Sequence, residues 1–161
     1  MSIEVIQRDL PRTSCGKSKK TPHQGDGKNM NDSGTRRALR GVNPTDLKPG
    51  GHYSSAMVAG DFVFLSGQTP RDADRKVIGD LIEEQTRATL ANVERVLAAA
   101  GAGLDDVVKV TVYLTDLTLF SRFNALYASW FAQHKPARTT VEAGLQGVLV
   151  EIDVVAYIGT R

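Results

Sequence analysis

The sequence contains very little cysteine, and this limits the chemistry open to it. Cys15 is the only cysteine among 161 residues, so the chain forms no internal disulfide and no thiolate metal cage. A reducing, cytoplasmic environment is the simplest expectation from this composition. His23, His52 and His134 are scattered without clustered carboxylates, so no metal site is expected.

The sequence also lacks a long apolar run and a strong excess of one charge. No stretch of about 18 apolar residues occurs, which argues against a membrane span. Residues 1–40 hold nine Lys or Arg and four Asp or Glu, a net charge of +5. Residues 41–161 hold eleven and fourteen, a net charge of −3. A broad basic surface for nucleic acid is therefore not expected.

The first 35 residues have no apolar period and are expected to form a disordered basic tail. Gly, Ser, Lys, Asn and Asp dominate residues 14–34, and such a composition cannot bury a core. A basic arm for an anionic partner is one interpretation, but a solvated tail or an expression remnant is favoured over it. Met30 is an alternative natural start, because the compact sequence begins soon after it.

Residues 36–161 are expected to form a single domain with the element order β-β-β-α-β-α-β-β. Apolar residues such as Leu90 and Leu97 recur at helical spacing, with Asp80 expected to cap the helix and Gly101 to end it. The expected strands cover residues 37–42, 55–59, 62–66, 108–115, 138–143 and 148–158, and the expected helices cover residues 81–100 and 117–133.

The fold class predicted by this order is α+β, with one mixed sheet and two helices packed on one face. In the last strand Val150, Ile152 and Val154 point to one face, while Leu149 and Val155 leave the other face partly apolar. A strand that is apolar on both faces favours burial on both sides. Because the helices cover only one face, we expect an oligomer that forms through the sheet.

The last two strands are predicted to form a hairpin whose turn contains Gly144 and Gly147. Arg138 lies on the first of these strands and Glu151 on the second, so the hairpin would hold them near each other. The planar arginine fork matches a carboxylate, and a glutamate can accept or relay a proton. The pair indicates a site for a small anion that undergoes proton-dependent chemistry.

Short motifs along the chain resemble those of one family. They are GHYSSA at 51–56, FLSGQTP at 64–70, QTR and LANV within 85–93, AAAG at 98–101, DVVKVTVYLTD at 106–116, FNALY at 123–127, PART at 136–139 and VEIDVVA at 150–156. Each motif alone is weak. Together, in this order, they resemble the Rid/YjgF family of reactive-intermediate (enamine/imine) deaminases.

The resemblance implies a chorismate-mutase-like fold and a homotrimer with clefts between its subunits. It implies hydrolysis of enamines or imines such as 2-aminoacrylate and 2-iminopropanoate, which yields a 2-oxo acid and ammonia. It also implies that no cofactor or metal takes part. The expected partners are the small imine or 2-oxo acid and further copies of the chain, with no membrane or nucleic-acid partner.

The resemblance also assigns five site residues by position. Arg138 matches the arginine that binds the substrate carboxylate, and Glu151 matches the acidic residue proposed to position the attacking water. Tyr53 matches a tyrosine that could hold the water or the substrate nitrogen. Ser66 matches a serine near the ligand. The next residue, Gly67, is also expected at the site because a glycine allows close backbone approach.

Two further positions belong to the expected cleft. Thr140 stands where many relatives have cysteine, so only its backbone N–H is expected to bind the carboxylate. Asn124 matches an asparagine expected to support the cleft. The sequence departs from the family pattern at His52 and Ser55 and in a shorter turn at residues 144–147, which leaves substrate preference open.

Other interpretations stay open at this point. Glu151 could instead form a structural ion pair with Lys109 or an arginine, and Arg138 could form a surface ion pair or a subunit contact. The clefts could bind small carboxylates without turnover. The chain could also act on RNA as a ribonuclease or translation inhibitor, or deaminate a larger, aminomuconate-like substrate.

Overall fold

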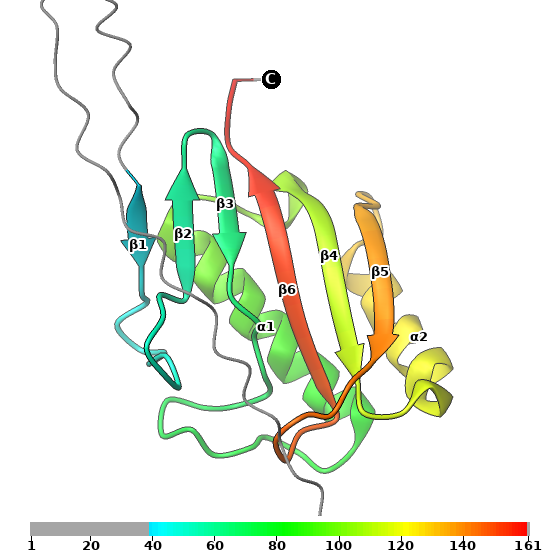
Figure 1. Ribbon diagram of the computed structural model, residues 1–161. Coiled ribbons are helices and arrows are strands. Elements are labelled where there is room, and N and C mark those ends of the chain that lie inside the picture. The colour runs from blue at the N-terminus through cyan, green and yellow to red at the C-terminus, as the bar shows by residue number, and fades with distance from the viewer. Residues whose placement is uncertain (1–38, 161) are drawn as a thin grey trace, which may run out of the picture. The chain divides into compact units, whose positions relative to one another are not determined.

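The structure is a computed structural model that describes residues 39–160. The expected tail over residues 1–35, with Cys15 and Met30, lies outside this part. The described residues form one six-stranded sheet and two α-helices (Figure 1). In chain order the elements are β1 (Arg40–Val42), β2 (Ala56–Ala59), β3 (Phe62–Leu65), α1 (Ile82–Ala100), β4 (Val107–Leu114), α2 (Phe120–Trp130), β5 (Ala137–Glu142) and β6 (Val150–Tyr157).

The strands lie side by side in the order β1-β2-β3-β6-β4-β5. β4 and β5 are parallel and all other neighbours are antiparallel, so the sheet is mixed, as expected. The expected hairpin between the last two strands is wrong, because β4 lies between β5 and β6 and pairs with both. Parallel strands need a crossover connection, and α2 supplies it between β4 and β5.

Both helices pack on the same face of the sheet, as expected from the sequence (Figure 1). Ile82, Leu90 and Leu97 of α1 are at most 1% exposed. They share one core with buried strand residues such as Val63 and Ile152. None of the described helices is long and apolar enough to cross a bilayer.

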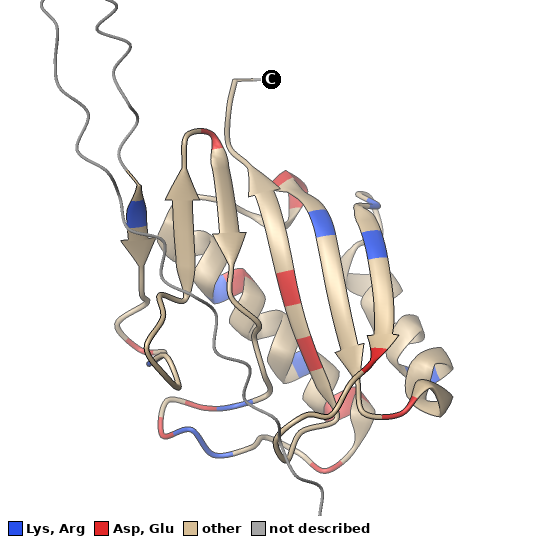
Figure 2. Cartoon of the chain, viewed as in Figure 1, with Lys and Arg blue, Asp and Glu red and all other residues tan. Residues whose placement is uncertain are grey.

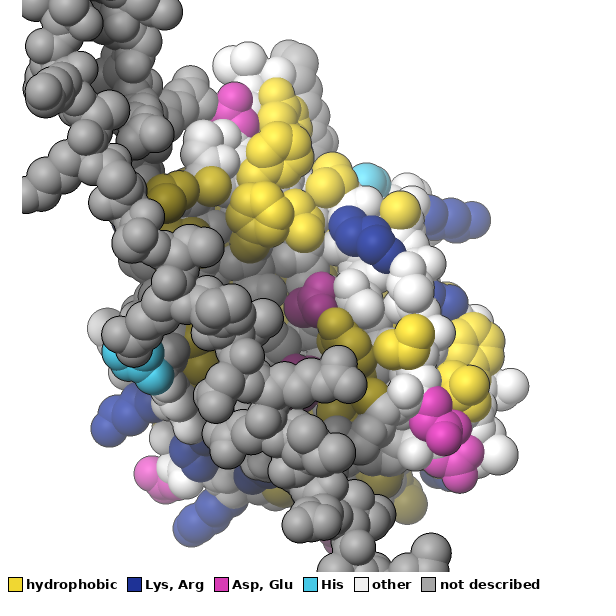
Figure 3. Space-filling model, in the orientation of Figure 1, with side chains coloured by type: hydrophobic (Ala, Val, Ile, Leu, Met, Phe, Trp, Pro, Cys, Tyr) yellow, Lys and Arg dark blue, Asp and Glu magenta, His cyan; other side chains and the backbone are white. Residues whose placement is uncertain are grey.

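The opposite face of the sheet, called the uncovered face below, has no helix within residues 39–160. Phe62 and Phe64 of β3 are 42% and 47% exposed there, and the Phe62 ring lies 5.2 Å from the ring of Tyr157 on β6. Figure 3 shows these apolar side chains gathered over β3 and the end of β6. A contiguous exposed apolar patch of this kind is typical of an interaction surface.

Both α-helices start differently from the predictions. In each case a carboxylate accepts hydrogen bonds from backbone N–H groups just before the helix. The Glu84 side chain accepts hydrogen bonds from the backbone N–H groups of Asp80 and Leu81, at 3.0 and 3.2 Å, so Asp80 does not cap α1. The Asp116 carboxylate accepts from the Thr118 N–H at 2.7 Å and starts a short 3₁₀ turn, Leu117–Leu119. Because this turn precedes it, α2 begins three residues later than predicted.

A β-bulge near the start of β4 changes which of its residues face the core. The pairing of β4 with β6 shifts register between Val107 and Lys109. Val107 is therefore buried and Val108 is 42% exposed, although regular alternation along the strand would bury Val108 together with Val110 and Val112. Val110 and Val112 beyond the bulge are both buried.

Two buried amide side chains of α1 fix the loops at one end of the sheet. Gln85 donates to the Gly79 carbonyl at 2.9 Å and accepts from the Leu149 N–H at 2.7 Å. Asn92 donates to the carbonyls of Thr69 and Arg71, each at 2.9 Å. Buried polar groups of this kind are costly unless bonded. These four bonds therefore hold the loop between β3 and α1, and the segment just before β6, against α1.

The end of α1 provides a test of the fold, because Gly101 adopts a left-handed conformation with φ of +84°. A Cβ at this position would meet no atom within 4 Å, so only backbone strain opposes it. Gly101→Ala should lower the free energy of unfolding by about 1 kcal/mol, as measured by urea denaturation. Gly103→Ala is the control, since its φ is −134° and it should be neutral. Equal effects of the two substitutions would contradict this account.

Candidate active site

The predicted site residues Tyr53, Ser66, Gly67 and Glu151 line one hollow of about 520 Å³, called the Glu151 pocket below. Its wall also includes the loop of residues 144–148. The hollow is large enough for a small metabolite. The structure thus brings together residues from three segments that are separate in the sequence.

Glu151 lies on β6 and faces away from the helices. It pairs across the sheet with Tyr113 of β4, and its neighbours Val150 and Ile152 are fully buried on the helix side. Gly67 is packed directly against the Glu151 carboxylate, which occupies the space where a Cβ would be. The adjacent Gln68 exchanges two backbone hydrogen bonds with Ile152, at 2.8 and 3.0 Å. This pairing fixes the close approach of Gly67 to Glu151.

The surroundings of Glu151 favour its protonated form. Partial burial raises the pKa of Glu151 above its ordinary value, and the nearby Asp153 carboxylate raises it further. Asp153 accepts a hydrogen bond from the Tyr113 hydroxyl at 2.9 Å. This bond is the main cause of the raised pKa of Tyr113. Figure 2 shows acidic positions along β6 and basic positions on β4 and β5.

Tyr53 and Ser66 have hydroxyl groups with defined partners. The Tyr53 hydroxyl accepts from the Gly50 N–H at 3.0 Å, and Tyr53 is 47% exposed. The Ser66 hydroxyl donates to the Ser54 carbonyl at 2.8 Å. Because the Ser66 hydroxyl donates to a backbone carbonyl and no histidine of residues 39–160 is hydrogen-bonded to it, the geometry does not suit an acyl-forming nucleophile.

Arg138 lies in a different place, on the helix side of the sheet. It pairs across the sheet with the buried Val110 and donates to the Asn124 side-chain oxygen of α2 at 2.8 Å. Its guanidinium lies 4.4 Å from the centre of the Tyr127 ring, a cation–π contact. No carboxylate within residues 39–160 forms an ion pair with it. Arg138 and Asn124 line a hollow of about 290 Å³. The two side chains and this hollow are called the Arg138 half-site below.

Two buried hydroxyl groups near Arg138 have no hydrogen-bond partner among the described residues. They are the Tyr127 hydroxyl and the Thr140 hydroxyl. Burial raises the pKa of Tyr127, and the positive charge of Arg138 opposes this change. Buried polar groups without partners are uncommon. They mark this region as one that a ligand or a neighbouring chain could complete.

The expectation that Arg138 and Glu151 lie near each other in one chain is therefore wrong. Side chains on neighbouring strands share a face when their residues pair directly. Arg138 shares the helix side with Val110, whereas Glu151 shares the uncovered face with Tyr113. No described residue lines both hollows. One chain thus presents two separate halves of the expected site.

The structure also resolves an alternative left open by the sequence. Lys109 donates to the Thr139 hydroxyl at 2.6 Å and does not form an ion pair with Glu151. Within residues 39–160 no three His, Cys, Asp or Glu side chains group closely enough to hold a metal ion.

The sequence analysis missed the two basic residues of the Glu151 pocket, Arg71 and Arg75. Both lie on the long loop between β3 and α1, which is rich in Pro, Asp and Arg. Their position was the sequence signal that could have indicated them, because both arginines follow the FLSGQTP motif within five residues. The bonds from Asn92 to this loop and from Arg71 to the Gln146 carbonyl show that the loop returns to the pocket.

Comparison with known proteins identifies the family. Residues 44–158 match the family described as Endoribonuclease L-PSP. The chain is 45% identical over 113 residues to a RutC family protein of Pyrococcus horikoshii, covering 68% of this chain and 90% of that protein. It is 38% identical over 123 residues to the mitochondrial protein MMF1 of Saccharomyces cerevisiae, covering 74% and 83%.

Solved structures agree with this assignment. YyfA from Yersinia pestis, a member of the conserved Rid protein family, has a TM-score of 0.71 at 36% identity, covering 75% of this chain and 100% of that chain. TdcF from E. coli, crystallised with bound serine, has a TM-score of 0.67 at 30% identity, covering 73% and 98%. This chain belongs to the Rid/YjgF family, which is also called the L-PSP family.

The environment of Glu151 predicts an effect on stability. A raised pKa in the folded state contributes stability that is present at low pH and lost as pH rises through that pKa. The ionised carboxylate therefore destabilises the fold near pH 7. Glu151→Gln should raise the melting temperature at pH 7 by about 1–4 °C, and the difference should shrink below about pH 4.

Glu94→Gln on the exposed side of α1 removes the same charge elsewhere and is the matched control for this measurement. It should leave the melting temperature nearly unchanged. Destabilisation by Glu151→Gln at pH 7 would contradict the proposed cost of the ionised group.

Proposed function

We propose that the protein hydrolyses reactive enamines and imines of the 2-aminoacrylate and 2-iminopropanoate type to 2-oxo acids and ammonia. The observation that carries this proposal is the complementary chemistry of the two half-sites. One offers a carboxyl group with a raised pKa in a hollow, and the other offers an arginine without a carboxylate partner among the described residues. Family membership supports it, as does the relative TdcF, whose bound serine is a small molecule with a carboxylate.

A homotrimer would complete the site by placing the Arg138 half-site of one subunit against the Glu151 pocket of the next. The exposed apolar side chains of the uncovered face, including Phe62 and Phe64, support such assembly because a second copy would remove them from water. β5 is an edge of the described sheet, so its outer backbone groups have no strand partner there. The assembly would combine residues that one chain holds apart.

The substrate carboxylate would bind to Arg138 and to the backbone N–H of Thr140. A guanidinium forms two parallel hydrogen bonds with a carboxylate. Asn124 already accepts from one nitrogen of Arg138, and the Tyr127 ring lies under the guanidinium. These contacts would orient the Arg138 guanidinium before the substrate binds. The side chain would then lose less conformational entropy on binding.

Glu151 would hold the attacking water, with Tyr53 assisting and with Ser66 and Gly67 shaping the wall. Water adds to the carbon of the protonated C=N bond, the resulting carbinolamine collapses, and the C–N bond breaks to release ammonia. A general base is more effective when its pKa lies closer to the working pH, and the surroundings of Glu151 shift its pKa upward. The reaction needs no cofactor, since water and proton transfer suffice.

RNA cleavage is a second candidate, because the matching family is described as an endoribonuclease. The net charge of −3 over residues 41–161 is unfavourable for RNA binding. Carboxylate binding without turnover is a third candidate. The cytoplasmic location expected from the sequence also remains a proposal, since the relative MMF1 is named as mitochondrial.

The reaction is tested by ammonia and pyruvate release from 2-aminoacrylate generated enzymatically in the assay. Arg138→Ala should lower kcat/KM by about 10- to 100-fold through loss of the charged hydrogen bonds. Arg138→Lys should recover only part of it, because an ammonium lacks the planar fork. Arg87→Ala on exposed α1 is the control. Full activity of Arg138→Ala would refute the assigned role, and saturable 2-oxo acid binding without ammonia release would favour the binding function.

If each site takes Arg138 from one subunit and Glu151 from another, two impaired variants should restore activity when they are mixed in one trimer. Arg138→Ala and Glu151→Gln trimers should each keep at most about a tenth of the wild-type activity. When the two variants are unfolded together and refolded, random assembly should restore about a quarter of the wild-type activity, because some sites then receive both intact residues. Activity that stays at the level of the separate variants would place Arg138 and Glu151 in one subunit's site or in none.

A further inference from the structure

Two arginines line the Glu151 pocket in addition to the residues that the proposed reaction uses. Arg71 and Arg75 both lie on the loop between β3 and α1 and both contribute to the hollow that Glu151 lines. Neither forms an ion pair with a carboxylate of residues 39–160. The pocket therefore has two guanidinium groups that no described acidic side chain neutralises at close range.

Arg71 is held in place from several directions. Its guanidinium donates to the carbonyls of Arg75 at 2.9 Å and Gln146 at 2.8 Å, which joins the two loops that border the pocket. Its own carbonyl accepts from Asn92 at 2.9 Å. A guanidinium has five N–H donors, so these two bonds leave donors for a ligand. A side chain fixed in advance loses little entropy when an anion binds.

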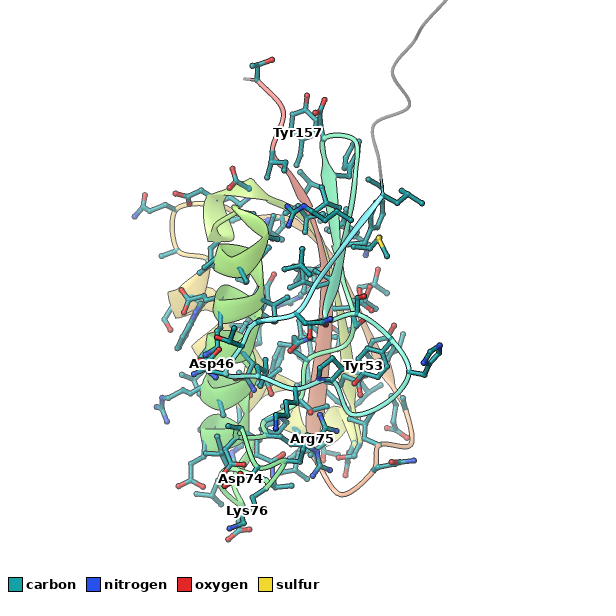
Figure 4. All side chains as sticks on the ribbon, turned by 90° about the vertical axis from the view of Figure 1, so that its left-hand side faces the viewer. Asp46, Tyr53, Asp74, Arg75, Lys76 and Tyr157 are labelled. Carbon is teal, nitrogen blue, oxygen red and sulfur yellow. The ribbon has the colours of Figure 1, made fainter. Side chains whose placement is uncertain are left out.

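Arg75 is held by an unusual backbone conformation. Its φ of +68° is the only positive value among the described residues other than glycine, and this region costs an L-residue about 1 kcal/mol or more. The Arg75 guanidinium packs against Gly50, at the place where a Cβ would be. The Gly50 N–H in turn donates to the Tyr53 hydroxyl at 3.0 Å. Figure 4 shows Arg75 on the Tyr53 side of its loop, with Asp74 and Lys76 nearer the loop's outer tip.

The Asp72 carboxylate, which lies between the two arginines in sequence, is engaged by backbone groups of its own loop. The Asp72 carboxylate accepts from the backbone N–H groups of Asp74 and Lys76, at 3.0 and 2.9 Å, and so shapes the loop. Within residues 39–160 Glu151 forms no ion pair with either arginine. Both guanidinium groups therefore remain open to an anion in the pocket.

We propose that Arg71 and Arg75 bind a second carboxylate at the far end of the substrate, so that the protein prefers imines of dicarboxylic amino acids. This inference rests on the proposed function. The 2-carboxylate would bind at the Arg138 half-site, and the side-chain carboxylate would bind at the arginine pair. Water adds to the C=N carbon and the C–N bond breaks, so the products are a 2-oxo dicarboxylate and ammonia. A hollow of about 520 Å³ accommodates a five-carbon acid of this kind.

The test compares imines that an amino-acid oxidase makes in the assay from glutamate and from alanine. The wild-type kcat/KM should be about tenfold higher for the glutamate imine, and Arg75→Gln should remove most of this preference. Arg71→Lys, which keeps the charge but loses the fork, should reduce the preference in part. Lys76→Ala removes a positive charge from the same loop without lining the pocket, so it should leave the ratio unchanged.

Saturation binding of 2-oxoglutarate and pyruvate separates this inference from the proposed function. If neither imine is hydrolysed, the proposed function fails. About tenfold weaker 2-oxoglutarate binding by Arg75→Gln, with the pyruvate affinity less affected, would still support the arginine pair. Absence of any wild-type preference for the dicarboxylic ligand, or an equal loss for both ligands in Arg75→Gln, would overturn it.

Discussion

Side chains alternate between the two faces of a β-strand, and in this sheet the helices α1 and α2 cover only one face. This constraint decides where each polar group can act. On β6 it sends Val150 and Ile152 into the core and leaves Glu151 on the uncovered face. On β5 it sends Arg138 toward α2. A single chain therefore cannot use both charged groups on one small molecule, and the proposed reaction needs more than one copy.

Much of the fold was predictable because the signals are local. The helical spacing of α1 and the short turn between β2 and β3 lie within continuous segments, and both predictions are confirmed. The last hairpin was mispredicted because neighbouring strands in sequence usually pair, whereas β4 displaces β5 from β6 here. The bulge at Val108 was missed because it depends on register with β6 rather than on the sequence of β4 alone.

The candidate site was predictable in its residues and not in its arrangement. Family motifs indicated Glu151, Gly67 and Arg138, but the residues that position the pocket act over long distances in the sequence. Gln85 and Asn92 form buried hydrogen bonds to the loop between β3 and α1 and to the segment just before β6. Only the fold reveals such bonds, because each partner is an ordinary backbone group that no sequence motif marks.

The features that lower the stability of an isolated chain are also the ones that favour assembly and ligand binding. The uncovered face exposes aromatic rings, and Tyr127 and Thr140 have buried hydroxyl groups without described partners. Partial burial of Glu151 favours the neutral form of a group that is useful when it can exchange a proton. Each feature lowers the stability of a single chain. Association through the uncovered face would remove the first cost. In the proposed trimer a neighbour would also reach Arg138, which lies on the edge strand β5, so that assembly and site formation would be one event.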